Sequence, residues 1–370
     1  MTSPKPVQLG LCCLNNTLRK QKPPIFSSRQ MIVRTINEKG IDVLKEKIIQ
    51  NLKDTIKLIE WNEENGIRVL RMSSHLFPHK TNPKIPQYDY NFAIELMQQV
   101  GAKAKEFGHR LTFHPGQYNV VGSPNDKVVK STEACLLYHA NVLTYMGMGK
   151  DSVMVVHGGG VYGDKEKTKQ RWCDNYNNMH EAVKYRLVLE NCERCFSIED
   201  CLEVSKKINI PVVFDTHHYE CYKLLHPEEK FKDPGEYIPD ILDSWKRRGV
   251  KPKFHVSEQG SGRTGHHSDY IEVLPDYLLE IPEKYGIDID IMIEAKMKEQ
   301  AIFKLYTKYP FLDCTKSIEK EEKEEEVILC MPSEEFVNKY CQDECDCCNG
   351  NTTIKKKKTW KRRLKLVESL

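Results

Sequence analysis

The 370-residue sequence predicts an α/β fold, a (β/α)₈ TIM barrel followed by a charged, cysteine-containing C-terminal appendage. Eight short apolar runs recur over the first 310 residues, segments of helical periodicity separate them, and the composition changes near residue 315. The competing arrangement is a doubly wound open sheet, and eight regular repeats argue against it. We therefore expect a barrel domain over residues 1–310 and a charge-rich, partly disordered extension over residues 315–370.

The predicted strands are short apolar runs, as expected for strands that are buried on both faces of a parallel sheet. They cover residues 7–13, 67–73, 110–114, 152–157, 186–191, 210–215, 252–257 and 287–294.

The intervening segments place apolar residues three or four positions apart, on one face of a helix. In the first of them Leu44, Ile48 and Leu52 follow this spacing, and Gly66 predicts the helix end. Ser197 with Asp200 predicts a helix cap. Helices are expected over 45–65, 91–107, 128–146, 165–185, 201–208, 237–248 and 299–309, with 270–285 as a bridge between the last two strands.

Composition indicates the class of protein but does not identify a binding partner. With 56 basic and 53 acidic side chains the net charge is only +3, so bulk charge identifies no partner. The N-terminus lacks an apolar leader, and no run of about 18 apolar residues occurs. The 14 cysteines are mostly scattered, as reduced thiols would be. We expect an intracellular protein of the nucleus or cytoplasm that is neither secreted nor membrane-bound.

The predicted appendage contains two unusual features. Four cysteines crowd into residues 341–348, in a spacing that matches no zinc pattern, and eight lysines and arginines fall within residues 355–365. The basic run suits phosphate binding or nuclear targeting, and equally a solvated tail.

Residues that bind metals follow the predicted strands. In a barrel, the carboxyl ends of all strands meet on one face, so these side chains would converge. A single histidine after a strand is usually structural, but six successive strands followed by histidine or a carboxylate are not explained that way. The residues are His114, His157, Glu190, Asp215, His218, His255 and Glu294 near strands three to eight, with His75 after the second and His266 and His267 after the seventh.

A mixed set of imidazoles and carboxylates suits Mn²⁺, Zn²⁺ or Fe²⁺ rather than Mg²⁺ or Ca²⁺. So many candidates indicate two or three ions, with an acid such as Glu190 bridging a pair. Such multinuclear sites activate water and hold both oxygens of a phosphoryl displacement. The alternative is a metal-dependent sugar isomerase or epimerase that uses a lysine such as Lys253 or Lys296.

Several longer motifs carry a resemblance to a known family. They are RMSSHLFPH (71–79), LTFHPGQYNVVGSP (111–124), VVHGGGVYGDK (155–165), LVLENCER (187–194), VVFDTHHY (212–219), KFHVSEQ (253–259), GHH (265–267) and MIEAKMKEQ (292–300). Over residues 7–305 the chain resembles the UV-damage endonucleases. The resemblance implies a TIM barrel related to endonuclease IV. It also implies a nick immediately 5′ of cyclobutane dimers, 6-4 photoproducts and some other lesions.

The resemblance further implies a centre of three divalent ions, Mn²⁺ first and Zn²⁺ as the alternative, in which Glu190 bridges two of them. The other ligands would be His114 and His157 on one ion, Asp215, His255 and Glu294 on the next, and His218 and His267 on the third. Within the neighbouring pairs His217/His218 and His266/His267, the sequence alone leaves the ligand open.

Other roles are also carried over from the family. Glu190 and Glu294 would be catalytic, Lys253 matches a lysine that can be carboxylated, and His75 matches a position beside the cluster that supports it or contacts substrate. Gln117 and Tyr118 match residues that wedge into the duplex at the lesion, where a damaged step is poorly stacked and cheap to open.

Asn15 matches a further DNA-binding asparagine, whereas Leu11 replaces a tyrosine that is common in bacterial members. We expect a monomeric, metal-dependent DNA repair endonuclease that acts on damaged double-stranded DNA without a nucleotide cofactor.

Overall fold

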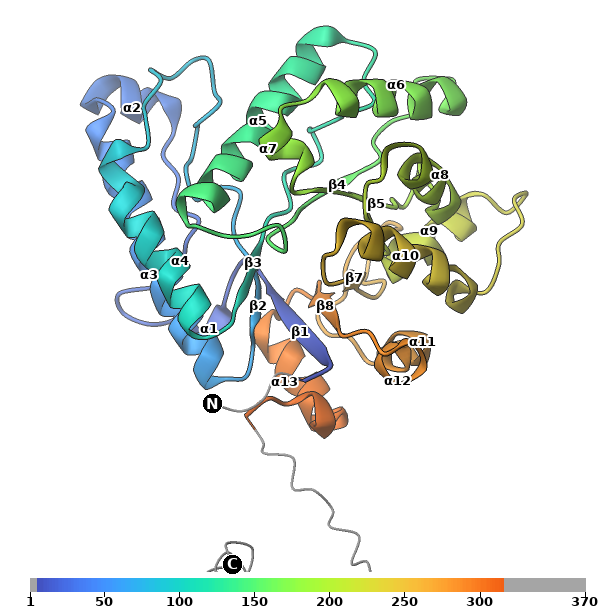
Figure 1. The fold of residues 1–370 in the computed structure, drawn as a ribbon. Helices are drawn as coiled ribbons and strands as arrows, with labels where there is room; N and C mark the ends of the chain where they lie inside the picture. Colours follow the sequence, from blue (N-terminus) through green and yellow to red (C-terminus); the bar gives the residue numbers. More distant parts are fainter. Residues whose placement is uncertain (1–4, 316–370) are drawn as a thin grey trace, which may run out of the picture. The chain divides into compact units, whose positions relative to one another are not determined.

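A computed structural model describes residues 5–315, in which eight parallel strands are surrounded by helices (Figure 1). The strands are β1 (Val7–Cys12), β2 (Val69–Arg71), β3 (Arg110–Thr112), β4 (Met154–His157), β5 (Leu187–Glu190), β6 (Val212–Val213), β7 (Lys253–Val256) and β8 (Ile289–Ile293). Each lies within a predicted run, so the sequence located all eight.

The strands form two parallel sheets, ordered β3-β2-β1-β8-β7 and β4-β5-β6. Single residue pairs join them at both edges: Phe113 pairs with Met154 beside β3 and β4, and Asp215 pairs with His255 beside β6 and β7. At the second junction the His255 N–H donates to the carbonyl of Phe214 at 3.0 Å. The strands therefore follow one another around a ring in chain order, which confirms the predicted barrel.

Thirteen α-helices are found in the described part of the chain. They are α1 (Asn16–Arg19), α2 (Val33–Lys39), α3 (Asp42–Glu64), α4 (Ile94–Glu106), α5 (Asp126–Tyr145), α6 (Lys165–Asn178), α7 (Glu181–Lys184), α8 (Ile198–Ile208), α9 (Thr216–Leu225), α10 (Ile238–Arg248), α11 (Asp276–Leu279), α12 (Ile281–Tyr285) and α13 (Glu299–Lys308). Short 3₁₀ turns cover Asn91–Ala93, Pro234–Tyr237 and Pro310–Leu312.

The helix predictions were correct in outline and wrong in detail. The helix expected over 165–185 is broken where Met179 adopts an extended backbone, which separates α6 from α7. The capping box of Ser197 and Asp200 is present and starts α8 earlier than predicted. Helix α9 was not predicted, and it begins directly after Asp215.

Most of the buried apolar side chains form one large cluster. Inside the ring, Cys12, Val69 and Met292 form a small separate cluster. Gly10 leaves room for it, because a Cβ there would lie 2.8 Å from the Met292 methyl carbon. Polar side chains occupy the interior on either side of this cluster along the strands.

An ion pair occupies the interior at the amino-terminal end of the barrel. Arg110 on β3 donates to Asp290 on β8 at 2.7 Å, and the Lys251 ammonium lies 2.5 Å from the same carboxylate. Both Arg110 and Asp290 are buried. This pair therefore joins β3 and β8 across the two strands that lie between them in the sheet.

The expectations for the C-terminal appendage concern residues outside the described range, including the cysteines of 341–348 and the basic run of 355–365. Among the described helices, none is both long and apolar enough to cross a bilayer.

Asp290→Ala should lower the free energy of unfolding by about 3–5 kcal/mol, because it leaves the buried Arg110 guanidinium uncompensated. Denaturant titration followed by circular dichroism measures the change. As a control, Arg34→Ala removes an exposed pair with Glu38 and should change stability by less than about 1 kcal/mol. Equal effects in the two variants would refute a structural role for the interior pair.

Candidate metal centre

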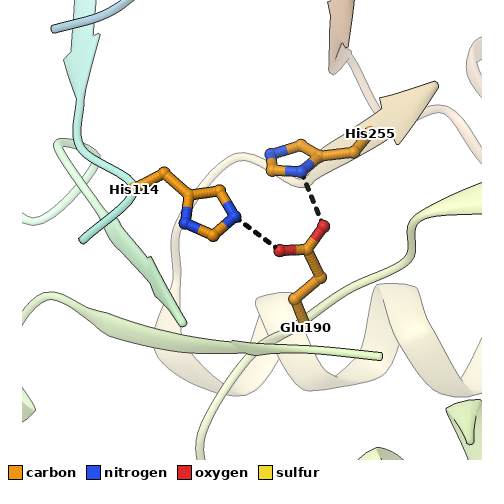
Figure 2. A group of neighbouring side chains, drawn as sticks. All are labelled: His114, Glu190 and His255. Carbon is orange, nitrogen blue, oxygen red and sulfur yellow. Dashed lines mark hydrogen bonds and ion pairs between the residues drawn. The ribbon is translucent and has the colours of Figure 1, made fainter. Parts of the chain in front are cut away.

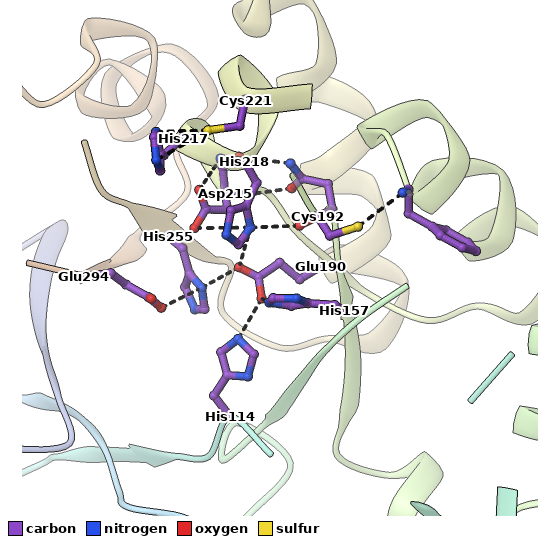
Figure 3. A network of polar contacts seen from close by, with 12 residues as sticks. His114, His157, Glu190, Cys192, Asp215, His217, His218, Cys221, His255 and Glu294 are labelled. Carbon is purple, nitrogen blue, oxygen red and sulfur yellow. Dashed lines mark hydrogen bonds and ion pairs between the residues drawn. The ribbon is translucent and has the colours of Figure 1, made fainter. Parts of the chain in front are cut away.

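The structure brings all eight predicted metal ligands together at the carboxyl ends of the strands, and Figure 3 shows all of them except His267. They are His114 after β3, His157 at the end of β4, Glu190 at the end of β5, Asp215 after β6, His218 in α9, His255 in β7, His267 in the following loop and Glu294 after β8.

Glu190 lies at the centre of this cluster and is completely buried. One carboxylate oxygen lies 2.9 Å from His114 Nε2 and 3.1 Å from His157 Nε2. The other lies 2.8 Å from His255 Nδ1 and 3.7 Å from His218 Nδ1. Figure 2 shows His114 and His255 facing different oxygens of the same carboxylate. Each oxygen thus faces two imidazoles, an arrangement suited to a carboxylate shared by two cations.

Electrostatics keep Glu190 ionised despite its position. Burial acts to raise its pKa, but the imidazoles of His255, His157 and His114 outweigh this effect and hold the pKa well below the usual range. Burial meanwhile lowers the pKa of His255 to about 4, with the Lys253 ammonium acting in the same direction. A neutral imidazole can offer a ring nitrogen to a cation, as ligation requires.

Glu294 extends the cluster towards β1 and β2. Its carboxylate lies 3.2 Å from His255 Nδ1 and 3.9 Å from His267 Nδ1, and it forms a close ion pair with Arg71. Burial acts to raise the pKa of Glu294, and Arg71 is the largest of the influences that lower it below the usual range. The sequence analysis did not predict this role for Arg71, which is the last residue of β2.

Asp215 provides the clearest test of whether this site suits a cation. One carboxylate oxygen caps α9 by accepting the His218 N–H at 2.8 Å. The other is buried, and no donor among the described residues forms a hydrogen bond with it. Burial, reinforced by Glu190 and Glu294, raises the pKa of Asp215 to about 7. This oxygen lies 3.7 Å from His218 Nδ1, beyond hydrogen-bond distance, so a cation would supply a closer partner and the residues present fit a divalent ion.

Asn191 positions two of these residues, which the sequence analysis also missed. Its side-chain amide donates to the Asp215 carbonyl at 3.0 Å and its oxygen accepts the Asp215 N–H at 2.8 Å. Its own carbonyl lies 3.1 Å from His218 Nδ1. The place of Asn191 directly after Glu190 was the available signal in the sequence.

The structure distinguishes the two members of each neighbouring histidine pair. His217 turns away from the carboxylates, with ring nitrogens 3.5 and 3.7 Å from the Cys221 sulfur. His266 accepts from Arg263 at 3.2 Å within its own loop. His218 and His267 are therefore the members of each pair that lie nearest the carboxylates.

Lys253 is completely buried beneath the cluster, with its amine 2.9 Å from His255 Nε2. Burial lowers the pKa of Lys253 to about 7, and the guanidinium groups of Arg71 and Arg110 contribute in the same direction. The lysine therefore places a buried amine directly beside one of the predicted ligands.

The remaining predicted residues lie outside the cluster. Gln117 and Tyr118 are exposed on the loop between β3 and α5, and Tyr118 is 67% exposed. His75 is exposed and lines a pocket of about 250 Å³ together with Tyr118. Asn15 is buried and caps α1, accepting the Leu18 N–H at 2.8 Å, so the structure does not present its side chain at the surface.

Fold and site together define a TIM-barrel protein with a candidate multinuclear metal centre. The chain belongs to the UV-endonuclease UvdE family, whose family model matches residues 7–324. It is 41% identical over 308 residues to a protein of Acanthamoeba polyphaga mimivirus that carries the provisional name UV-damage endonuclease; the match covers 82% of this chain and 91% of that one.

Two further similarities agree with this membership. The chain is 38% identical over 312 residues to the UV-damage endonuclease of Schizosaccharomyces pombe, covering 82% of this chain but 50% of the fungal one. The chain thus spans about half the length of that relative. It also matches the crystal structure of SacUVDE with a TM-score of 0.70 and 25% identity, covering 83% of this chain and 100% of that one.

Asn191→Ala should weaken Mn²⁺ binding about 10–100-fold, the usual effect of removing a residue that orients metal ligands. Calorimetric titration of the metal-stripped chain measures the affinity, with circular dichroism to verify folding. As a control, Asn178→Ala removes the same amide group from an exposed side chain and should leave the Mn²⁺ affinity unchanged. Equal affinities in the two variants would contradict the positioning role.

Proposed function

We propose that this chain is a metal-dependent DNA repair endonuclease that nicks the phosphodiester immediately 5′ of UV photoproducts and of some other lesions. Membership of the UvdE family supports this class of activity and speaks against the sugar isomerase left open by the sequence. The observation that carries the proposal is the buried carboxylate of Glu190, which offers each oxygen to two imidazoles on the active face of the barrel.

The donor set supports three divalent ions, with Mn²⁺ preferred and Zn²⁺ the alternative. We assign Glu190 as the bridge between two of them. The remaining ligands would be His114 and His157 on one ion, Asp215, His255 and Glu294 on the second, and His218 and His267 on the third. When bound, such ions lower the pKa of coordinated water and stabilise the charge of a phosphoryl displacement.

The chain's own residues hold this set in place. Arg71 pairs with Glu294 and so limits the positions that the carboxylate can adopt. Asn191 orients Asp215 and His218. The depressed pKa of Lys253 makes its neutral amine available near neutral pH, and a neutral amine is the form that can be carboxylated. We assign Lys253 to that modification.

DNA recognition is assigned to the loop that follows His114. Gln117 and Tyr118 are exposed on it, so both can enter a duplex without rearranging the core. An inserted aromatic ring would stack against bases at a damaged step.

Because His75 and Tyr118 line one pocket, we assign His75 to substrate contact rather than to support of the ions. Asn15 is assigned to capping of α1, which its observed hydrogen bond supports better than DNA contact.

Action as a monomer and a nuclear or cytoplasmic location remain predictions from the sequence.

The full-length chain with Mn²⁺ should convert UV-irradiated supercoiled plasmid to the nicked form and leave untreated plasmid largely supercoiled. Agarose gel electrophoresis measures the conversion. Chelation should abolish nicking, and re-addition of Mn²⁺ should restore it, because the ligands alone do not supply the activated water. Equal nicking of irradiated and untreated DNA would refute lesion specificity, whereas nicking that survives chelation would refute metal dependence.

Glu190→Gln should reduce the nicking rate by more than about 100-fold, beyond the usual loss for residues that only orient ligands. The variant keeps the shape of the side chain and removes the charge shared between the imidazoles. Binding to irradiated duplex, measured by fluorescence anisotropy, should change much less. The matched control Glu228→Gln removes an exposed carboxylate and should nick normally. A Glu190→Gln variant with normal activity would disprove the bridging assignment.

A further inference from the structure

Two cysteines with C-x-x-C spacing lie just beyond Glu190, in the loop between β5 and α8. They are Cys192 and Cys195, separated by Glu193 and Arg194. Both thiols are free in the structure. The sequence analysis treated the cysteines of the barrel as isolated thiols, and the metal centre described above does not use this pair.

The loop is folded around the Cys192 sulfur, which is labelled in Figure 3. The backbone N–H groups of Cys195 and Phe196 donate to it at 3.3 and 3.2 Å. The Cys192 N–H donates to the Phe196 carbonyl at 3.0 Å, which closes the turn. The first of these contacts places the Cys192 sulfur against the backbone of Cys195, so the turn brings the two cysteines together before any reaction.

The two thiols differ in access and reactivity. Cys192 is only 6% exposed, whereas Cys195 is partly exposed. The pKa of Cys195 is lowered to about 6, mainly by the hydrogen bond from Cys192, with smaller contributions from the Val161 N–H and the Lys165 ammonium. The more accessible cysteine is therefore also the one with more thiolate at neutral pH, which is the form that attacks disulfides.

We propose that Cys192 and Cys195 form a redox-active dithiol that reacts with low-molecular-weight disulfides. The Cys195 thiolate attacks one sulfur of the small disulfide, whose S–S bond breaks and releases one thiolate. Cys192, after losing its proton to solvent, attacks the Cys195 sulfur of the mixed disulfide and releases the second thiolate. The protein loses two thiol protons and two electrons, and the small disulfide takes them up to become two thiols.

Cys12 and Cys13 are another pair of neighbouring free cysteines in the described part of the chain. These two are adjacent in sequence, so their Cα atoms lie about 3.8 Å apart, which is shorter than the usual separation of about 4.4–6.8 Å across a disulfide. Both sulfurs also contact Arg71. The loop pair is therefore better arranged for disulfide formation.

The test uses the full-length chain in buffers of reduced and oxidised glutathione, quenched with N-ethylmaleimide and digested with trypsin. Cleavage after Arg194 places Cys192 in LVLENCER and Cys195 in CFSIEDCLEVSK, so the disulfide links two peptides. We expect both free thiols to be lost and one linked pair to appear as the buffer becomes more oxidising. Reduced glutathione should reverse the change.

Two variants test which cysteines form the disulfide. Cys192→Ser should stop at the glutathione adduct of Cys195, because the resolving thiol is absent. Cys201→Ser, which alters a completely buried cysteine in the same peptide, should still give the linked pair. Failure to form the linked pair in oxidised glutathione, or its loss in Cys201→Ser, would overturn the proposal. The measurement on the unchanged chain decides the matter even if a variant fails to fold.

Discussion

The buried carboxylate of Glu190 is the constraint on which the rest of the site depends. An isolated carboxylate in a protein interior is strongly disfavoured, so its surroundings must compensate for the lost water. Here the compensation comes from imidazoles on β4 and β7, on the loop after β3 and on α9, which all point at one side chain. The ring brings these elements together. Each imidazole lies close to the same carboxylate because the charge of that buried carboxylate must be balanced.

Charged and apolar side chains alternate in layers along the barrel interior, and this arrangement allows each buried charge to be balanced by its neighbours. Arg110 and Asp290 neutralise each other at the amino-terminal end, and Met292 with its apolar neighbours separates them from the carboxylates above. Lys253 lies on the same strand as His255, two residues nearer the amino-terminal end. Since successive residues of a strand point to opposite faces, residues two apart on β7 and β8 supply these layers in turn.

The sequence was sufficient for the barrel, because apolar runs of regular spacing marked the strands. It also indicated which residues converge at the candidate metal centre, because they are polar residues at the carboxyl ends of those strands. The role of Arg71 was hidden, since its partner Glu294 is distant in sequence and nothing local marks a strand-end arginine as an ion-pair donor. The choice between His217 and His218 depended on α9. Once Asp215 caps that helix, its third residue faces the carboxylates and its second faces Cys221.

The closure of the ring by single residue pairs at two junctions has a thermodynamic consequence. One junction, Asp215 with His255, consists of two candidate ligands of the same ion, and His114 directly follows Phe113 at the other. An ion bound by residues on both sides of these junctions would link the two sheets. Because binding to the closed ring alone adds to its stability, metal loading and barrel closure would be coupled as one equilibrium. The chain's resistance to opening would then depend on the supply of free metal ions around it.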